Sequence, residues 1–122
     1  MGSKNRRKLG NLSNIFLHKI RNVFSEDIVY ITDNKIKKLN SNRPELNKYF
    51  EEKEFQTLID NVKKVYYNEE DKIYNCLTES DGKLFIFGIV SKNVRNEVTT
   101  LFITNDRQID KKFPNDNNLI EF

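Results

Sequence analysis

The sequence predicts an α+β domain with N-terminal helices packed on one face of an antiparallel sheet of about four to five strands. Two observations lead to this class. Helical spacing of apolar residues dominates the first half of the chain, whereas β-branched and aromatic runs between polar turns dominate the second half. The 122 residues suit one domain, expected at residues 25–113 between a basic leader (1–24) and a C-terminal tail (114–122).

The composition predicts a small core inside a strongly solvated exterior. Only 37% of the residues are hydrophobic and 32% are charged, but nine Phe and five Tyr supply large apolar side chains. The single Cys76 and single His18 exclude an intramolecular disulfide, a cysteine-rich zinc site and a multi-histidine metal centre. No run approaches the ~20 apolar residues of a membrane span and no signal-peptide core is seen, so we expect a cytoplasmic protein without a metal or cofactor.

The leader concentrates positive charge. The whole chain carries a net charge of +3, and residues 1–25 contain six basic residues and no acidic one, so the remainder is mildly acidic. A basic segment on an acidic body favours contact with phosphate, an anionic membrane surface or an acidic partner. The candidate nucleic-acid contacts in this segment are Arg6, Arg7 and Lys8.

A helix over residues 9–24 is predicted, because apolar residues recur there at three- and four-residue intervals. We expect this helix to dock on the domain. The alternative is a surface helix that contacts a membrane or RNA, although its polar face lacks the strong positive charge typical of membrane-surface helices.

The stretch that follows predicts a strand and then a helical layer. Residues 28–32 are β-branched and aromatic, and Asp33 is placed to cap a helix over residues 34–39. A turn is expected at Pro44, because the residue before a proline is driven out of the helical region. Pro44 also suits the first position of a new helix, and residues 54–62 continue with apolar positions at helical spacing.

The second half predicts a meander of antiparallel strands. The pair Asp81-Gly82 predicts a tight hairpin, Gly88 a possible bulge, and the nearly continuous apolar run around it the central strand. Residues 105–113 fit a short helix or an irregular segment, and the end of the chain is expected to fray. The expected strands span residues 65–67, 73–77, 84–90 and 98–104.

Basic residues gather on the first helical unit of the domain. Lys35, Lys37, Lys38 and, past the turn, Arg43 can contact phosphate, and Lys83 and Thr104 lie at the ends of expected strands. The carboxylates are scattered and no glycine-rich phosphate loop is present, so metal-dependent and nucleotide-triphosphate chemistry lack support. Metal-free RNA cleavage needs only a base, an acid and groups that stabilise the phosphorane. For any single lysine, solvation of the helix surface is the simpler interpretation.

The segment order IVYIT, DNKIKKLNSNRPEL, FQTLIDNVKKVYY, KLFIFGIV and TTLFIT resembles the phage-associated branch of the barnase–EndoU–colicin–RelE nuclease superfamily. The resemblance implies a toxin of a phage or mobile element that cleaves RNA, with tRNA among its substrates, through the 2′-OH without metal. It also implies a cognate antidote protein. With the proline turn aligned, Lys38 stands in place of the family histidine and Asn42-Arg43 in place of Arg-His.

Three hypotheses about the function stay open. Lys38 and Arg43 could contact phosphate and stabilise charge, with Thr104 as a hydrogen-bond donor and Lys83 as a second cation. A lysine base, however, requires a pKa several units below the usual ~10.4. The competing hypothesis is a non-catalytic binding module or inhibitor that occupies a host protein or nucleic-acid complex. A third hypothesis is that the basic leader attaches the protein to a membrane surface.

Overall fold

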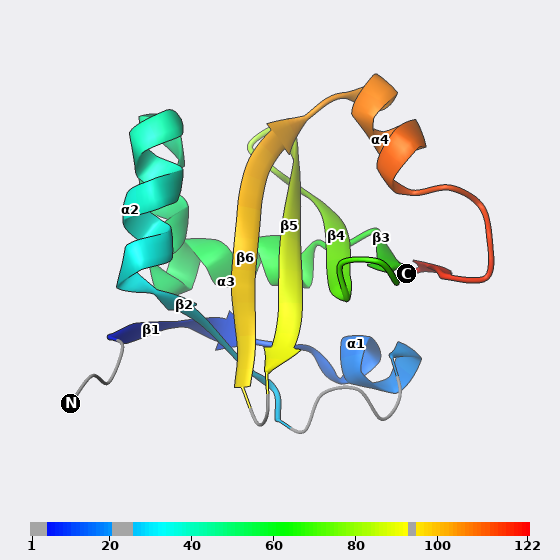
Figure 1. The fold of residues 1–122 in the computed structure, drawn as a ribbon, viewed down its shortest axis with the longest axis horizontal. Helices are drawn as coiled ribbons and strands as arrows, with labels where there is room; N and C mark the ends of the chain where they lie inside the picture. The colour runs from blue at the N-terminus through cyan, green and yellow to red at the C-terminus, as the bar shows by residue number, and fades with distance from the viewer. Residues whose placement is uncertain (1–4, 21–25, 93–94) are drawn as a thin grey trace.

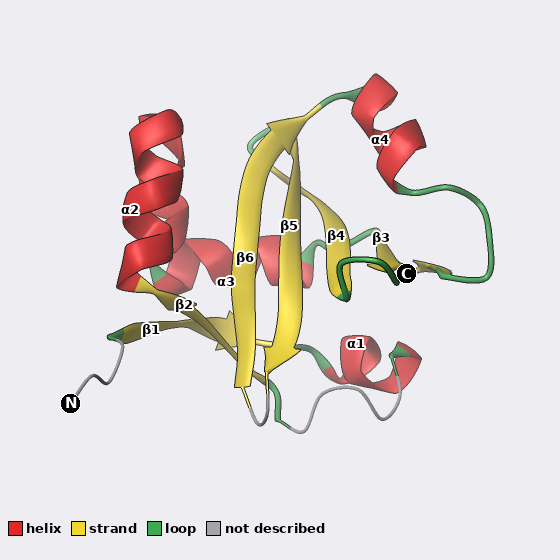
Figure 2. Cartoon of the chain, in the orientation of Figure 1, coloured by secondary structure: helices red, strands yellow, loops and turns green. Residues whose placement is uncertain are grey.

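The computed structural model describes residues 5–20, 26–92 and 95–122, and its fold is α+β (Figures 1 and 2). Within these ranges the chain forms one mixed sheet of seven strands and five helical segments. The strands are β1 (Arg6–Asn11), β2 (Ile28–Thr32), β3 (Lys64–Asn68), β4 (Ile73–Ser80), β5 (Lys83–Lys92), β6 (Arg95–Thr104) and β7 (Leu119–Glu121). The helices are α1 (Asn14–Lys19), α2 (Asp33–Asn42), the 3-10 helix η1 (Pro44–Phe50), α3 (Glu52–Asp60) and α4 (Asp106–Lys112).

The predicted antiparallel meander forms the middle of the sheet. The strand order is β1-β2-β6-β5-β4-β3-β7, so β5 is central as expected, and β3, β4, β5 and β6 pair antiparallel in succession. The sheet is larger than predicted and is mixed, because β2 lies parallel to β6. A parallel neighbour is possible because the chain between these two strands passes through the helical layer and the meander, which is a long crossover connection.

The helices α2, η1 and α3 bury their apolar residues in one main core against the sheet, and Figure 2 shows α3 behind β5 and β6. Helix α3 contributes Phe55, Leu58 and Ile59, which share one face of the helix. The Phe55 ring meets Phe87 of β5 at a centroid distance of 5.0 Å. The N-terminal helical layer therefore covers one face of the sheet, as the sequence predicts.

The opposite face of the sheet, called here the open face, carries a smaller apolar cluster. Leu77, Ile86 and Phe113 are buried in it, and Ile109 of α4 packs against them. Helix α4, one of two alternatives expected for residues 105–113, thus lies on the face that the other helices leave uncovered (Figure 1).

The predicted helix over residues 9–24 is wrong in its first part. Residues 6–11 form β1, an edge strand antiparallel to β2, and only α1 is helical; residues 21–24 lie outside the described residues. Leu9 and Leu12 are buried in the structure, as they would be in a docked helix, so the spacing of apolar residues alone does not distinguish a strand from a helix here. Gly10 fits the close packing of β1 on α3, because a Cβ at this position would lie 2.6 Å from Gln56 Oε1.

The C-terminal residues are ordered, contrary to the expected fraying. Residues 119–121 form β7 on the edge of β3, and the Phe122 ring lies 5.4 Å from that of Phe16 on α1. Lys19 Nζ donates a hydrogen bond to the Glu121 carbonyl at 2.8 Å. Both ends of the described chain therefore belong to the same sheet.

Four local predictions are settled by the structure. Thr32, rather than Asp33, caps α2, because its Oγ1 accepts a hydrogen bond from the Lys35 amide at 3.2 Å. Asp81 and Gly82 have φ angles of 52° and 75°, as a hairpin turn between β4 and β5 requires, and the register shift at Gly88 confirms the bulge. Cys76 is fully buried, and burial raises the pKa of its thiol, which confirms the apolar interpretation.

Asn96 holds the parallel junction between β2 and β6. Its side chain is fully buried, and Nδ2 donates to the carbonyls of Glu26 at 2.7 Å and Ile28 at 3.0 Å. These are the backbone groups that lead into β2. The Oδ1 atom of the same amide is buried and has no hydrogen-bond partner among the described residues, so the amide acts on this junction through its donor side.

Asn96→Ala is therefore expected to lower the free energy of unfolding by about 2–3 kcal/mol, since it removes two buried hydrogen bonds and leaves a cavity. Urea denaturation measures this loss, with Asn14→Ala on exposed α1 as the control. Equal stability of the two variants would show that the amide does not hold this junction.

Candidate functional site

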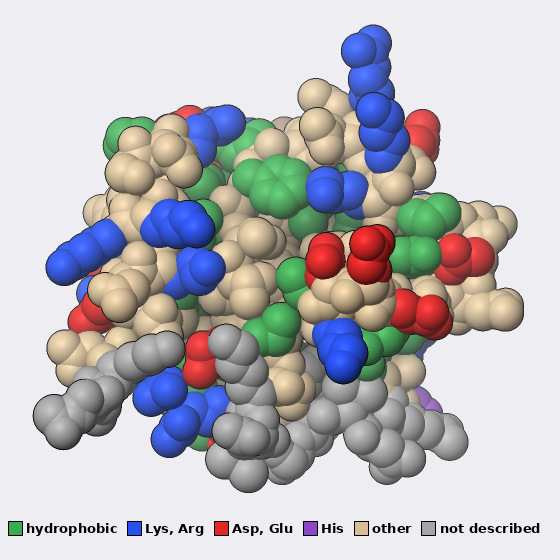
Figure 3. Space-filling view, in the orientation of Figure 1, with side chains coloured by type: hydrophobic (Ala, Val, Ile, Leu, Met, Phe, Trp, Pro, Cys, Tyr) green, Lys and Arg blue, Asp and Glu red, His purple; other side chains and the backbone are tan. Residues whose placement is uncertain are grey.

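A hollow of about 270 Å³ opens between the start of α2 and the middle of β6. We call it the α2–β6 hollow. It lies where the first turn of α2 stands beside β6, and Figure 3 shows basic side chains gathered over α2 on this side of the molecule. Its lining residues are Thr32, Asn34, Lys35, Lys38, Glu97, Val98 and Thr99.

The geometry of the hollow follows from how α2 begins. Strand β2 ends at Thr32, whose side chain caps the helix, so the first turn of α2 stands directly beside β6. Lys35 and Lys38 are three residues apart and therefore lie on the same side of α2. Lys37 is exposed and is not a lining residue. Two of the three predicted α2 lysines thus converge on the hollow.

Glu97 places a carboxylate opposite these lysines. It is paired in register with Tyr30 of β2, and its side chain is only 13% exposed. Arg6 of β1 donates a hydrogen bond through Nε to Glu97 Oε2 at 3.3 Å. This contact, made across β2, holds the carboxylate in one orientation.

The lining of the hollow carries more positive than negative charge, with Lys35 and Lys38 against Glu97. Among the residues that the structure describes, neither Lys35 nor Lys38 forms an ion pair with a carboxylate. Glu97 is already engaged by Arg6. The hollow can therefore attract an anion, and the hydroxyl of Thr99 and the amide of Asn34 add neutral hydrogen-bonding groups to its wall.

The other three predicted catalytic residues do not line this hollow. Arg43 ends α2 and binds Glu45 at 3.0 Å through Nε. Lys83 begins β5, and Thr104 ends β6 beside the neighbouring Leu84, with its hydroxyl donating to the Asn105 carbonyl at 3.4 Å. The three therefore lie near the far end of the meander from Glu97, where β6 ends and β5 begins (Figure 1).

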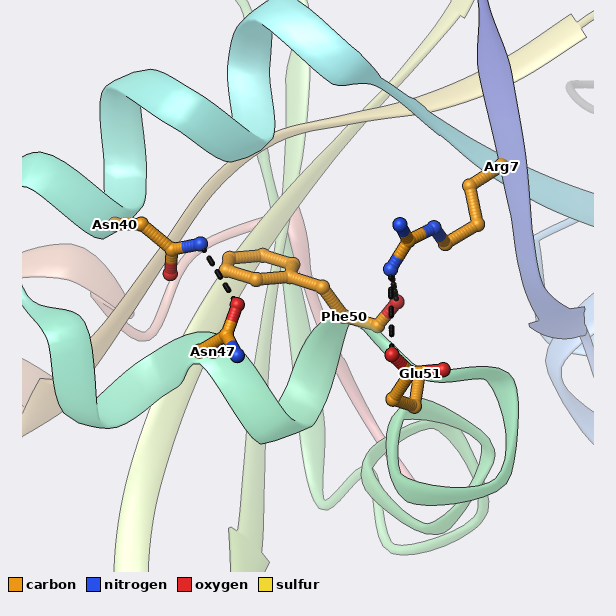
Figure 4. Close-up of polar contacts among 5 residues, drawn as sticks. All are labelled: Arg7, Asn40, Asn47, Phe50 and Glu51. Carbon is orange, nitrogen blue, oxygen red and sulfur yellow. Dashed lines mark hydrogen bonds and ion pairs between the residues drawn. The ribbon is translucent and has the colours of Figure 1, made fainter.

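The cations of β1 have partners within the fold. Arg7 Nη1 donates to the Phe50 carbonyl at 2.9 Å and approaches Glu51 Oε1 at 3.5 Å (Figure 4). Lys8 lies 3.4 Å from Glu52. Figure 4 also shows Asn40 and Asn47, whose side chains join α2 to η1 by a 2.9 Å hydrogen bond. Arg7 and Lys8, two of the predicted nucleic-acid contacts of the leader, thus attach edge strand β1 to the helical layer, whereas the third, Arg6, binds Glu97 of β6.

Sequence reasoning missed Glu97, Thr99, Asn34 and Thr32. Glu97 falls in a segment expected to be a turn, whereas β6 begins two residues before it. One signal was present in the sequence: Glu97 is the only acidic residue between Lys83 and Asn105. A lone carboxylate within a stretch that is otherwise apolar, polar-neutral or basic merits attention as a site residue.

In the described part of the chain, no group of three or more His, Cys, Asp or Glu side chains gathers in a way that could hold a metal ion. None of the helices in this part has the length and apolar character to cross a membrane. No protein-family model matches the sequence, and no curated protein or solved structure shows significant similarity to the chain.

The ion pair between Lys48 and Asp81, close to Lys83, can be tested by titration. Lys48 Nζ donates to Asp81 Oδ2 at 3.0 Å, and this hydrogen bond lowers the pKa of Asp81 from its ordinary 3.8. Because the folded pKa is lowered, the pair contributes to stability above about pH 3.8, and the contribution is lost as the pH falls through the folded pKa.

Lys48→Met is expected to return the Asp81 pKa toward its ordinary value, because the methionine keeps the apolar stem and removes the donor. NMR titration of the Asp81 carboxyl carbon measures the change. Lys53→Met, on an exposed residue of α3, is the matched control and should leave Asp81 unchanged.

Proposed function

We propose that this chain cleaves RNA without a metal ion, at the α2–β6 hollow. The observation that carries the proposal is the convergence of two lysines on a hollow that also contains an oriented carboxylate. The lysines suit a phosphate, and the carboxylate is a hydrogen-bond acceptor that can take a proton from a hydroxyl. RNA supplies both groups on adjacent atoms, because its 2′-OH lies beside the phosphodiester.

In the proposed reaction Glu97 accepts the proton of the 2′-OH. The 2′-oxygen forms a bond to phosphorus while the bond from phosphorus to the 5′-oxygen breaks. The Lys35 and Lys38 ammonium groups stabilise the negative charge of the phosphorane, and one of them gives a proton to the departing 5′-oxygen. The products are a 2′,3′-cyclic phosphate and a 5′-hydroxyl.

This arrangement supports catalysis without the family histidine. A glutamate on β6 would take the role of base, so that Lys38 would serve as a cation and would not have to lose its proton before the reaction. Thr99 lines the hollow and Thr104 does not. The Thr99 hydroxyl donates to the Gly88 carbonyl at 3.4 Å, so its oxygen is the group that it offers to the hollow, as an acceptor. Arg43 and Lys83 have no part in this step. A toxin role, a phage origin, an antidote and a cytoplasmic location remain predictions from the resemblance and the composition.

The test is incubation of the protein with total tRNA in EDTA, with the product ends identified by their chemistry. Wild type should give 2′,3′-cyclic phosphate ends. Glu97→Gln should lower the rate by about 10²–10⁴-fold and Lys38→Ala by about 10²-fold, since each removes one catalytic group. Lys37→Ala changes a lysine of the same helix that does not line the hollow, and should cleave like wild type.

Circular dichroism and thermal unfolding of each variant separate loss of chemistry from loss of fold. Intact RNA at high concentrations of the wild-type protein would refute cleavage. Tight RNA binding without cleavage, weakened by Lys38→Ala, would instead support the non-catalytic binding module at the same hollow. Recovery of one stoichiometric host protein, with no affinity for RNA, would refute RNA cleavage and support the inhibitor.

A further inference from the structure

A second hollow, of about 500 Å³, lies on the open face between the β3–β4 hairpin and the chain that follows α4. We call it the C-terminal hollow. Nothing in the proposed reaction uses it. Its lining residues are Tyr66, Asn68, Glu69, Asn75, Lys111, Lys112, Pro114, Asp116 and Asn118.

Hydrogen bonds between the sheet and the C-terminal segment hold the walls of this hollow. The Tyr66 hydroxyl donates to Asp116 Oδ2 at 2.8 Å, a contact that raises the pKa of the phenol, and Asn118 Nδ2 donates to Glu69 Oε1 at 3.2 Å. The buried Phe113 anchors the same segment. The hollow is therefore formed before any ligand binds.

The lining charges of the C-terminal hollow balance. Lys111 and Lys112 are offset by Glu69 and Asp116, and Figure 3 shows acidic and basic side chains together on this half of the open face. The α2–β6 hollow, in contrast, has an excess of positive charge. The α2–β6 hollow therefore favours a phosphate, whereas a neutral ligand with many hydrogen-bonding groups fits the C-terminal hollow better.

Asn75 is the lining residue that the fold itself does not explain. It lies in β4 between Ile73 and Leu77, on the same face as both, although asparagine is disfavoured in strands. Within the described part of the chain, its side-chain amide has no hydrogen-bond partner. An amide with donor and acceptor side by side can bind the edge of a nucleobase, and the neighbouring Tyr66 adds an aromatic ring.

The two hollows are linked by one row of residues across the sheet. Tyr66 pairs with Asn75, Asn75 with Gly88, and Gly88 with Thr100. Thr100 follows Thr99, which lines the α2–β6 hollow. Three strand intervals of about 4.8 Å separate β6 from β3, or about 14 Å, a span that a single strand of a few nucleotides can cross.

We propose that the C-terminal hollow binds the base of a nucleotide that flanks the cleaved phosphate. The proposal rests on the proposed function in one respect, because cleavage at the α2–β6 hollow sets the course of the RNA strand. It concerns binding, however, and can be tested without cleavage. The Asn75 amide hydrogen-bonds the base edge, and Tyr66 offers its ring to the base. The phosphates between the two sites pass over the row that joins them.

The experiment uses the full chain and a 2′-O-methyl tetranucleotide, which binds but cannot be cleaved. Fluorescence anisotropy should show about three- to tenfold weaker binding for Asn75→Ala, since it loses one base contact, and at least as large a loss for Tyr66→Ala, since it loses the ring and the hydroxyl that binds Asp116. The salt dependence should be unchanged in these variants, because no phosphate contact is lost, and reduced in Lys38→Ala. Asn14→Ala, on the exposed side of α1, is the control.

The outcomes distinguish the two proposals. If Asn75→Ala and Tyr66→Ala, both folded, bind the tetranucleotide as wild type does, the base site is refuted, whatever the cleavage assay shows. If they weaken binding while wild type leaves RNA intact, the base site stands and cleavage fails. If cleavage occurs, Asn75→Ala should lower kcat/KM for a tetranucleotide and not for a dinucleotide. An equal effect on both substrates would overturn the proposal.

Discussion

The parallel pairing of β2 with β6 is the constraint on which the rest of this structure depends. Only two residue pairs define its register, Val29 with Asn96 and Tyr30 with Glu97. The buried Asn96 amide reinforces it by binding two carbonyls at the start of β2. Because α2 follows β2 without a loop, this short junction decides where the helix stands and so creates the α2–β6 hollow.

Polar side chains then stabilise the edge that this pairing adds to the sheet. Gln56 of α3 binds both backbone groups of Asn11, accepting from its amide at 2.8 Å and donating to its carbonyl at 3.0 Å. The side chain thus takes the place of a further strand and protects an otherwise open edge. Arg6 reaches over β2 to Glu97, so the same edge strand also orients the proposed base.

The distribution of charge partners separates structural cations from functional candidates. Arg7, Lys8 and Arg43 are each offset by a nearby glutamate, and exposed pairs of this kind contribute little to stability. Lys35 and Lys38 have no such partner among the described residues and face a hollow. We therefore choose Lys35 and Lys38 among the many basic residues because of their surroundings.

The sequence alone determined the α+β class, the meander, the central place of β5, the hairpin at Asp81-Gly82 and the bulge at Gly88, because local periodicity and turn chemistry specify these features. It also identified Lys35 and Lys38 as candidates. Only the tertiary structure decided that residues 6–11 form a strand, that β2 lies parallel to β6, and that Glu97 faces Lys38 while Thr104 does not. Each of these depends on pairing between segments far apart in the chain, which local spacing does not encode.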